Sequence, residues 1–315
     1  MTRLLQIVAL AAAVILLAFA PQAIAAEEQK AVLITGASTG IGRNMAETLA
    51  AEGFFIYAGA RKDKDLAELD ALENIKAVRL DVTKQDDIDA AVALIRDEGR
   101  GLWGLVNNAG VATSGPVADL EDSDFDFVLN VNVNGVVRVT RAFIPLIVES
   151  KGRIVTTGSI AGILSSPGSS AYSMSKHAME AFTDSLAREI EPVGVRVSVI
   201  EPGSYKSRIR RTTVARIAKN IEASGSELTD EIKARMQAAA EREVTLKEPD
   251  EVSAAALHAL SSETPHRRYM VVPNEEEADL TIRKAIEELV QLNTWGPYSY
   301  SRDEIVQMLD EALAE

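Results

Sequence analysis

Tyr172, Lys176 and Ser159 are the residues whose types and spacing best fit proton transfer to a reacting oxygen. Tyr172 and Lys176 lie four positions apart in a segment with helical periodicity, so they share one helix face. A tyrosine hydroxyl can give its proton to a carbonyl that is being reduced, but its ordinary pKa of about 10 hinders exchange near neutral pH. An ammonium group about 4 Å away can lower that pKa by roughly three units. We expect Lys176 to supply this charge.

Ser159 directly follows a strand-like run, at the edge where open α/β sheets place their ligands. There its hydroxyl can hydrogen-bond a substrate oxygen and stabilise developing negative charge. Each of the three residues also has an ordinary structural explanation. A Tyr–Lys pair at helical spacing is commonly a surface feature, and a serine after a strand often caps a turn.

A glycine-rich loop lies between a predicted strand and a predicted helix at residues 36–42. Glycines there permit a tight turn and close approach of the backbone to a pyrophosphate, and the helix N-terminus offers unpaired N–H groups to that anion. The alternative is a flexible turn without a ligand. The predicted cofactor contacts in this loop are Gly36, Ser38, Thr39, Gly40, Ile41 and Gly42.

The second predicted strand ends in Ala60, Arg61 and Lys62. An NAD site usually has an acidic residue here to hold the ribose 2′-hydroxyl, whereas a 2′-phosphate requires a cation. Arg61 and Lys62 therefore predict NADP(H) as the preferred cofactor. NAD(H) stays open because Asp63 and Asp65 follow closely, and the two basic residues could simply begin a solvated loop.

Short apolar runs alternate with amphipathic segments along the body of the chain. Parallel pairing is expected because each strand is followed by a helix-length crossover, and nearly continuous apolar strands indicate a sheet covered on both faces. We predict an α/β doubly wound parallel sheet, a three-layer α/β/α Rossmann fold with C-terminal helical additions. The expected strands are 31–35, 54–59, 77–80, 102–106, 153–157, 195–200 and 268–272, and the expected helices are 41–51, 86–97, 131–149, 171–190 and 249–260.

Composition excludes several classes of site and partner. The formal net charge of −14 repels phosphate backbones, so nucleic acid is not an expected partner. The chain has no cysteine, which excludes disulfides, cysteine–zinc sites and thiol nucleophiles. Its three histidines are too few and too scattered to predict a metal site: His177, His258 and His266.

The first 26 residues have the layout of a secretory signal peptide. Arg3 precedes an apolar run from residue 4 to residue 20, and Ala23-Ile24-Ala25 forms a cleavage pattern before acidic residues. An uncleaved membrane anchor is the alternative, because the apolar run is near the short limit for spanning. Both predict an exported, periplasmic or secreted protein, or one held at the membrane. A cytoplasmic location follows if the segment is not a functional signal.

Two regions are expected after the leader. Residues 27–275 form a single domain, within which the helical, charged segment 208–245 would cover the substrate and set specificity. Residues 276–315 form a C-terminal extension of two helices around an aromatic turn. A basic cluster in the segment 208–245 could meet an acidic substrate or a membrane surface, but a solvated helix face is the favoured explanation; it comprises Arg208, Arg210, Arg211, Arg216 and Lys219.

Together these motifs resemble the short-chain dehydrogenase/reductase family, in its order and spacing over about residues 30–207. Residues 79–83 and 101–110 resemble the retinol and hydroxysteroid dehydrogenase branch, which includes hydroxybutyrate dehydrogenases. The motifs are Thr35-Gly-Ala-Ser-Thr-Gly-Ile-Gly42, Asp81-Val82, Asn107-Asn-Ala-Gly110, Asn132, Ser159, Tyr172-x-x-x-Lys176 and Pro202-Gly203.

The resemblance implies roles for further residues. Lys176 would also hold the nicotinamide ribose, and Asn132 would hold a water that links Lys176 to solvent, although Asn130 and Asn134 lie close by. Asp81 and Val82 would contact the adenine ring, unless Asp81 caps the helix that follows. Further cofactor contacts implied by the resemblance are Tyr172, Asn108, Ala109, Gly110, Pro202, Gly203 and Ser207, the last at a position where the family often has threonine.

The resemblance also implies a small hydrophobic alcohol or carbonyl substrate and a homodimer or homotetramer built on the helices 131–149 and 171–190. Two other functions stay open. A non-catalytic NAD(P)-binding sensor or scaffold would bind cofactor without turnover. A sugar-nucleotide epimerase or dehydratase also uses Tyr-x-x-x-Lys, but with a different glycine spacing and a larger substrate domain.

Overall fold

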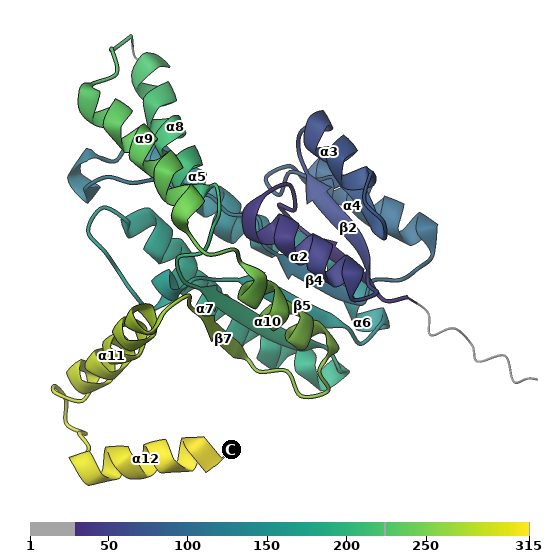
Figure 1. Ribbon diagram of the computed structural model, residues 1–315. Coiled ribbons are helices and arrows are strands. Elements are labelled where there is room, and N and C mark those ends of the chain that lie inside the picture. The colour runs from purple at the N-terminus through teal and green to yellow at the C-terminus, as the bar shows by residue number, and fades with distance from the viewer. Residues whose placement is uncertain (1–28, 224, 315) are drawn as a thin grey trace, which may run out of the picture.

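Seven parallel strands form one sheet in the order β3-β2-β1-β4-β5-β6-β7 (Figure 1). The computed structural model describes residues 29–223 and 225–314 of the chain, so the predicted signal or anchor segment lies outside the described residues. The strands are β1 (Ala31–Ile34), β2 (Phe55–Ala60), β3 (Ile75–Arg79), β4 (Gly104–Asn107), β5 (Arg153–Thr157), β6 (Arg196–Pro202) and β7 (Arg268–Val271).

Helices connect the strands and cover both faces of the sheet (Figure 1). Short turns of other helix types are η1 (Val117–Asp119), η2 (Asn130–Gly135), η3 (Ile160–Gly162) and η4 (Glu191–Val193). The α-helices are α2 (Gly40–Ala51), α3 (Asp63–Asp70), α4 (Gln85–Glu98), α5 (Asp122–Leu129), α6 (Val136–Glu149), α7 (Ser170–Ile190), α8 (Ile209–Ala223), α9 (Asp230–Thr245), α10 (Asp250–Ser261), α11 (Glu275–Leu292) and α12 (Arg302–Ala314).

Two separate apolar clusters fill the space between the sheet and its helices. One packs α4, α6 and α7 on one face through side chains such as Ile88, Phe143 and Leu186. The other packs α2, α3 and α10 on the opposite face through side chains such as Leu49 and Leu69. Both faces of the sheet are thus shielded from water, which explains why all four residues of β1 are buried. The predicted doubly wound, three-layer architecture is confirmed.

The strand order reverses between β1 and β4, which are neighbours in the sheet although β2 and β3 separate them in sequence. In doubly wound sheets the crevice outside the carboxyl ends of two such strands receives the ligand. The loops after β1 and β4, together with those after β5 and β6, therefore define the edge at which the candidate residues gather.

The sequence analysis did not predict α3 and α5, and the helix predicted over residues 131–149 begins earlier in the structure. α3 is short and acidic and buries only Leu69, so its apolar periodicity is weak. α5 joins the π-helical turn η2 and α6 into one helical run, Asp122–Glu149, whereas the prediction began at residue 131. That run is the one helix among the described residues long and apolar enough to span a membrane, and half of its most apolar window is buried inside the fold.

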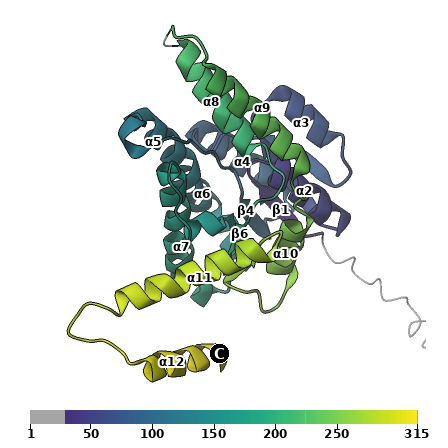
Figure 2. The same ribbon diagram turned by 60° about the vertical axis from the view of Figure 1, so that its left-hand side comes forward.

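Two helical pairs project from the body of the molecule (Figures 1 and 2). α8 and α9 pack against each other beyond the carboxyl edge of the sheet. α11 leaves the end of β7, and α12 follows it after a turn, with no side chain of α12 buried among the described residues. These are the two helices expected in the C-terminal tail.

Candidate active site

Three glycines in the loop after β1 are required by close approach of other segments. Gly36 has a φ of +67°, and a Cβ there would lie 2.8 Å from the Ala109 Cα. A Cβ on Gly40, whose φ is +58°, would lie 3.2 Å from the Ser207 Cα. A Cβ on Gly42 would overlap the side-chain amide of Asn108. The loop is therefore held against the segments after β4 and β6.

The N-terminus of α2 has the features of an anion site. Its N-cap residue, Thr39, has extended backbone and makes no side-chain capping hydrogen bond, and the first turn of the helix has no acidic residue. The positive end of the helix dipole and its N–H groups thus meet no negative side chain of the helix itself. Together with the close-packed glycines, these residues fit the pyrophosphate of a dinucleotide cofactor.

Thr35 and Asn108 fasten this loop to the end of β4. The Thr35 Oγ1 accepts hydrogen bonds from the backbone N–H groups of Asn108 and Ala109, each at 3.0 Å. The Asn108 side-chain amide donates to the carbonyl oxygens of Thr35 and Gly36 at 3.0 and 3.2 Å, and accepts from the Thr157 Oγ1 at 3.3 Å. Sequence reasoning assigned no role to Thr35 or Thr157, although each is a polar residue at the end of an apolar strand.

The end of β2 is basic, and the aspartate that Arg61 approaches there is also hydrogen-bonded to Thr83. Arg61 lies 3.8 Å from the carboxylate of Asp81, which follows β3. Asp81 accepts hydrogen bonds from the backbone N–H and hydroxyl of Thr83 at 3.0 and 2.7 Å. Burial opposes ionisation of Asp81, but the bonds from Thr83 and the charges of Arg61 and Lys84 lower its pKa overall. The N-cap of α4 is Lys84, so Asp81 does not cap that helix.

Ser159, Tyr172 and Lys176 come together beside this loop. Lys176 is buried, and its Nζ donates to the Thr157 carbonyl at 2.7 Å and lies 5.7 Å from the centre of the Tyr172 ring. Ser159 caps η3 by accepting from the Ala161 N–H at 3.1 Å, and it also donates to the Pro202 carbonyl at 3.4 Å. Burial raises the pKa of Tyr172, and Ser159 lies close enough to the Tyr172 hydroxyl to oppose part of that rise. Ser159 therefore both caps a turn and lies beside Tyr172.

The expected depression of the Tyr172 pKa by Lys176 is wrong, because that pKa is raised. Burial raises the pKa of Tyr172, while Ser159 and the charge of Arg210 oppose that rise without cancelling it. Burial also lowers the pKa of Lys176 to about 8, although the nearby carboxylate of Glu180 acts in the opposite direction. Both charged forms are disfavoured because the pair is withdrawn from water, and Lys176 directs its ammonium to the Thr157 carbonyl rather than to the Tyr172 hydroxyl.

Asn132 lies in the π-helical turn η2, with both groups of its side chain bonded. Its Nδ2 donates to the Val111 carbonyl at 2.8 Å and to the Ser175 Oγ at 2.9 Å, and its Oδ1 accepts from the Val111 N–H at 2.9 Å. Asn134 is exposed and Asn130 is only partly buried. Asn132 is therefore the member of the three that ties the loop after β4 to α7, next to Lys176.

The remaining residues predicted around the cofactor line the same edge. Val82 packs against Gly135 of η2, where a Cβ would come within 2.7 Å of the valine side chain. Ser207 lies against Gly40. After Pro202 and Gly203, the Ser204 N–H donates to the Glu277 carboxylate at 2.8 Å, so the first turn of α11 closes this loop. Sequence reasoning did not place Glu277 at the site, because nothing local connects it with residue 204. Gly110 lies in the segment that follows β4. Lys62 is the N-cap residue of α3, just after the end of β2.

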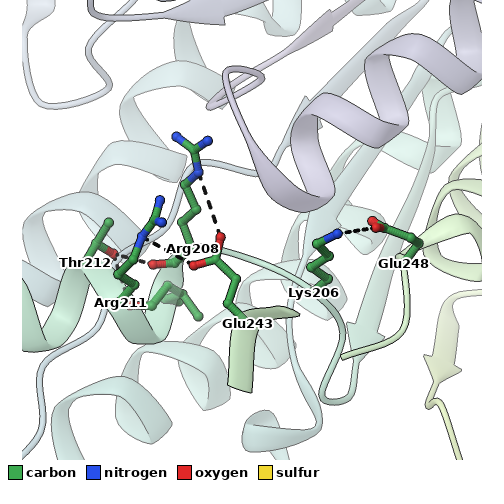
Figure 3. A network of polar contacts seen from close by, with 7 residues as sticks. Lys206, Arg208, Arg211, Thr212, Glu243 and Glu248 are labelled. Carbon is green, nitrogen blue, oxygen red and sulfur yellow. Dashed lines mark hydrogen bonds and ion pairs between the residues drawn. The ribbon is translucent and has the colours of Figure 1, made fainter. Parts of the chain in front are cut away.

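Most of the basic cluster on α8 is bonded within the protein rather than simply solvated. Arg208 and Arg211 both pair with Glu243 of α9, at 4.0 and 3.3 Å, and the neighbouring Lys206 pairs with Glu248 (Figure 3). Arg216 pairs with an aspartate of α5 and stacks on Phe127. Arg210 differs from these residues, since its charge acts on the Tyr172 hydroxyl.

Comparisons with known proteins agree with this arrangement. A short chain dehydrogenase family model matches residues 30–218. The chain is 38% identical over 266 residues to a mitochondrial D-beta-hydroxybutyrate dehydrogenase of Bos taurus, covering 76% of each chain. It is 37% identical over 211 residues to a retinol dehydrogenase of Rattus norvegicus, covering 65% of this chain and 66% of that one. The chain belongs to the short-chain dehydrogenase/reductase family.

A solved member of the family from Burkholderia phymatum, determined in complex with NAD, superposes with a TM-score of 0.72 at 25% identity, covering 87% of this chain and 99% of that one. A second, from Streptomyces avermitilis, gives a TM-score of 0.70 at 27% identity. The suspected family is thus confirmed, and the relatives named for D-beta-hydroxybutyrate and retinol are consistent with the retinol and hydroxysteroid dehydrogenase branch. The protein is an NAD(P)-dependent oxidoreductase acting on CH–OH groups.

Proposed function

We propose that this short-chain dehydrogenase uses NADP(H) to interconvert a carbonyl and an alcohol on a small hydrophobic substrate of retinoid, steroid or aliphatic type. The observation that carries this proposal is the meeting of Ser159, Tyr172 and Lys176 beside the glycine loop after β1. A sensor or scaffold that only binds cofactor would not require all three groups together at the edge where a substrate oxygen would lie.

Each side chain has a distinct role in this reaction. A bound nicotinamide supplies or takes up the hydride. In the reducing direction Tyr172 gives its proton to the substrate oxygen, which Ser159 holds by a hydrogen bond. Lys176, fixed by the Thr157 carbonyl, would bind the nicotinamide ribose and restore the proton to Tyr172. Asn132 ties η2 to α7 through Ser175, next to Lys176, and would hold a water that links Lys176 to solvent.

NADP(H) preference is proposed from the charges at the end of β2. Ala60 is buried and carries no acid for a ribose hydroxyl, and Arg61 lies 3.8 Å from the carboxylate of Asp81, the residue expected beside the adenine. Asp63, which kept NAD(H) open, is paired with Arg79. Asp65 lies in the first turn of α3, where a carboxylate interacts favourably with the helix dipole.

A second candidate substrate class is a short hydroxy acid. Arg210 acts electrostatically on the Tyr172 hydroxyl and has no ion-pair partner among the described residues. A guanidinium in this place can bind a substrate carboxylate. A relative that is named for hydroxybutyrate also supports this class, while relatives named for retinol support the hydrophobic one.

Steady-state oxidation of NADPH and NADH by residues 27–315, with retinal, ketosteroids, aldehydes and small keto acids, tests the proposal. Arg61→Ala is expected to weaken NADPH use by about tenfold and to leave NADH nearly unchanged, as for loss of one charge-assisted bond. Arg210→Ala separates the substrate classes, because it should reduce turnover of keto acids much more than turnover of neutral carbonyls, for which only its charge on Tyr172 is lost. Cofactor binding without turnover on any carbonyl would favour the sensor. Tightly bound cofactor regenerated in each cycle would favour an epimerase or dehydratase.

We also propose a homodimer or homotetramer built on α6 and α7, and export or membrane attachment through residues 1–26. Light scattering of the purified protein tests the assembly, and a monomer at micromolar concentration would contradict it. Intact-mass measurement of the native protein tests the leader. A mass that retains residues 1–25 would contradict cleavage after Ala25 and leave the membrane anchor or a cytoplasmic location.

A further inference from the structure

A buried and a partly buried glutamate lie near the catalytic side chains, on the neighbouring elements β6 and α7. Glu201 near the end of β6 is 2% exposed, and the Glu180 side chain on α7 is 15% exposed. Arg268 of β7 reaches both from the side. Its Nε lies 3.0 Å from the Glu180 carboxylate and 3.8 Å from that of Glu201, and its Nη2 lies 2.8 Å from the more exposed Asp184.

The cluster contains one cation and three carboxyl groups, so its charges do not balance if all are ionised. One oxygen of Glu180 and one of Glu201 are buried without a hydrogen-bond partner. Both carboxyl groups approach the same nitrogen, the Arg268 Nε, at 3.0 and 3.8 Å, so they are neighbours in a place withdrawn from water. Two ionised carboxylates repel each other there, whereas a protonated carboxyl group can donate a hydrogen bond to an ionised neighbour. A buried acid pair of this kind is expected to retain one proton.

Burial and the charge of Glu180 raise the pKa of Glu201 to about 8, while Arg268 acts against this rise. Burial also raises the pKa of Glu180, but Arg268 stabilises its ionised form. The charged groups that face the pair are Lys176 and Asp184 from α7 and Arg268 from β7. Because Arg268 bonds Glu180 and only approaches Glu201, the proton belongs mainly on Glu201.

Glu180 also packs directly on the segment that carries Ser159. A Cβ on Gly158 would lie 3.3 Å from the Glu180 Oε1, and a Cβ on Gly162 would lie 3.0 Å from the same atom. Glu180 follows Lys176 by one helical turn, and its charge raises the Lys176 pKa. Glu180 thus packs against residues 158–162, and its charge acts on Lys176.

We propose that Glu180 and Glu201 share one proton and act as positioning residues, holding residues 158–162 in place and keeping Lys176 protonated. The shared proton itself is independent of the reaction. The effect on catalysis rests on the function proposed above. The sequence analysis assigned no role to either glutamate.

Infrared spectroscopy of the whole protein as a function of pH tests the shared proton without any substrate. A protonated carboxyl band is expected at pH 6 that disappears as the pH passes about 8. Glu201→Gln, which keeps the shape and can still donate to Glu180, should remove this band. Asp184→Asn removes another carboxylate bonded to Arg268 and should leave the band in place. If Glu201→Gln does not fold, Glu180→Gln should shift the titration of the band.

Cofactor binding as a function of pH tests the action on Lys176. Glu180→Gln removes the charge that raises the Lys176 pKa, so the pH at which affinity falls should move downward by about one unit, while Asp184→Asn should leave it unchanged. A role confined to packing would weaken binding equally at every pH.

Two results would overturn the proposal. The first is the absence at pH 6 of a carboxyl band that depends on Glu201. The second is a pH dependence of cofactor binding that is the same in Glu180→Gln and in the unaltered protein. Failure of the proposed function would appear differently, as normal bands and normal binding shifts without turnover on any substrate.

Discussion

The carboxyl edge of the sheet and the C-terminal arm, residues 275–314 with α11 and α12, differ in what holds each side chain. At the edge, Asn132, Lys176 and Thr35 are buried and bonded to segments far away in sequence. In the arm, Leu292 is 80% and Trp295 92% exposed, and the polar bonds are mostly local. The edge is therefore specified by the whole fold, and the arm by its neighbours in sequence.

Local signals account for the helices of the arm. Asn274 caps α11 by accepting from the Glu277 N–H. Ser301 and Glu304 form a reciprocal capping box at the start of α12, with bonds of 2.7 and 3.3 Å between side chain and backbone. Such bonds set where a helix begins, but they bury no apolar surface. A substitution should thus matter greatly at the edge and little in the arm.

The largest effect is expected from Lys176→Met, which removes a buried ammonium and its bond to the Thr157 carbonyl. Turnover should fall by about 10²–10⁴-fold, as for loss of a group that acts in proton transfer. The measurement is kcat/KM with the best substrate of the panel. Lys64→Met, at an exposed position on α3, is the control and should leave the rate unchanged.

The next largest effect is expected from Gly36→Ala. A Cβ there meets the Ala109 backbone at 2.8 Å in addition to the cost of a positive φ, so the free energy of unfolding should fall by about 3 kcal/mol. Gly53→Ala is the matched control, because its φ is also positive, at +90°, but no atom lies within 4 Å of the new Cβ. Urea unfolding that shows equal losses for both would contradict the close approach.

A smaller effect is expected from pH on cofactor affinity. The pKa of Lys176 is lowered to about 8, so the ammonium is present below that pH and is lost as the pH rises through it. Loss of a charged hydrogen-bond donor should weaken cofactor binding by about tenfold between pH 7 and 9.5. Fluorescence titration measures this change. An affinity that is constant across this pH range would show that the Lys176 ammonium does not contribute to cofactor binding.

The smallest effect is expected in the arm. Removal of residues 301–315 deletes α12, which buries no side chain among the described residues, so the free energy of unfolding should change by less than about 0.5 kcal/mol. Removal of residues 276–315 also takes away Glu277, which bonds the Ser204 N–H at the site. Only the longer deletion should reduce cofactor affinity. A large loss of stability on deletion of residues 301–315 would instead indicate that α12 packs against the body of the protein.

The same contrast explains what the sequence could predict. Apolar strands, glycine turns and helical periodicity are local, so the sheet, most helices and the motif residues at its edge could be foreseen. Asp63–Asp70 was missed because it buries a single side chain. The partners of Asn108 and the approach of Glu277 to Ser204 could not be foreseen, because they join segments distant in sequence.

The error about Tyr172 has a similar origin. Spacing placed Lys176 on the same helix face, but spacing does not reveal how much water the fold removes or which acceptor the ammonium chooses. In the structure burial outweighs the neighbouring charges, and the Tyr172 pKa rises.

Transfer of deuterium from a deuterated reduced nicotinamide to the substrate carbon tests the central claim most directly. The purified protein, mixed with labelled NADPH or NADH and the carbonyl panel, should give a labelled alcohol detected by mass spectrometry. Tyr172→Phe should still bind cofactor but form that product at least about 10²-fold more slowly. Equal rates of label transfer in both proteins, or bound cofactor with no transfer to any carbonyl, would contradict the account.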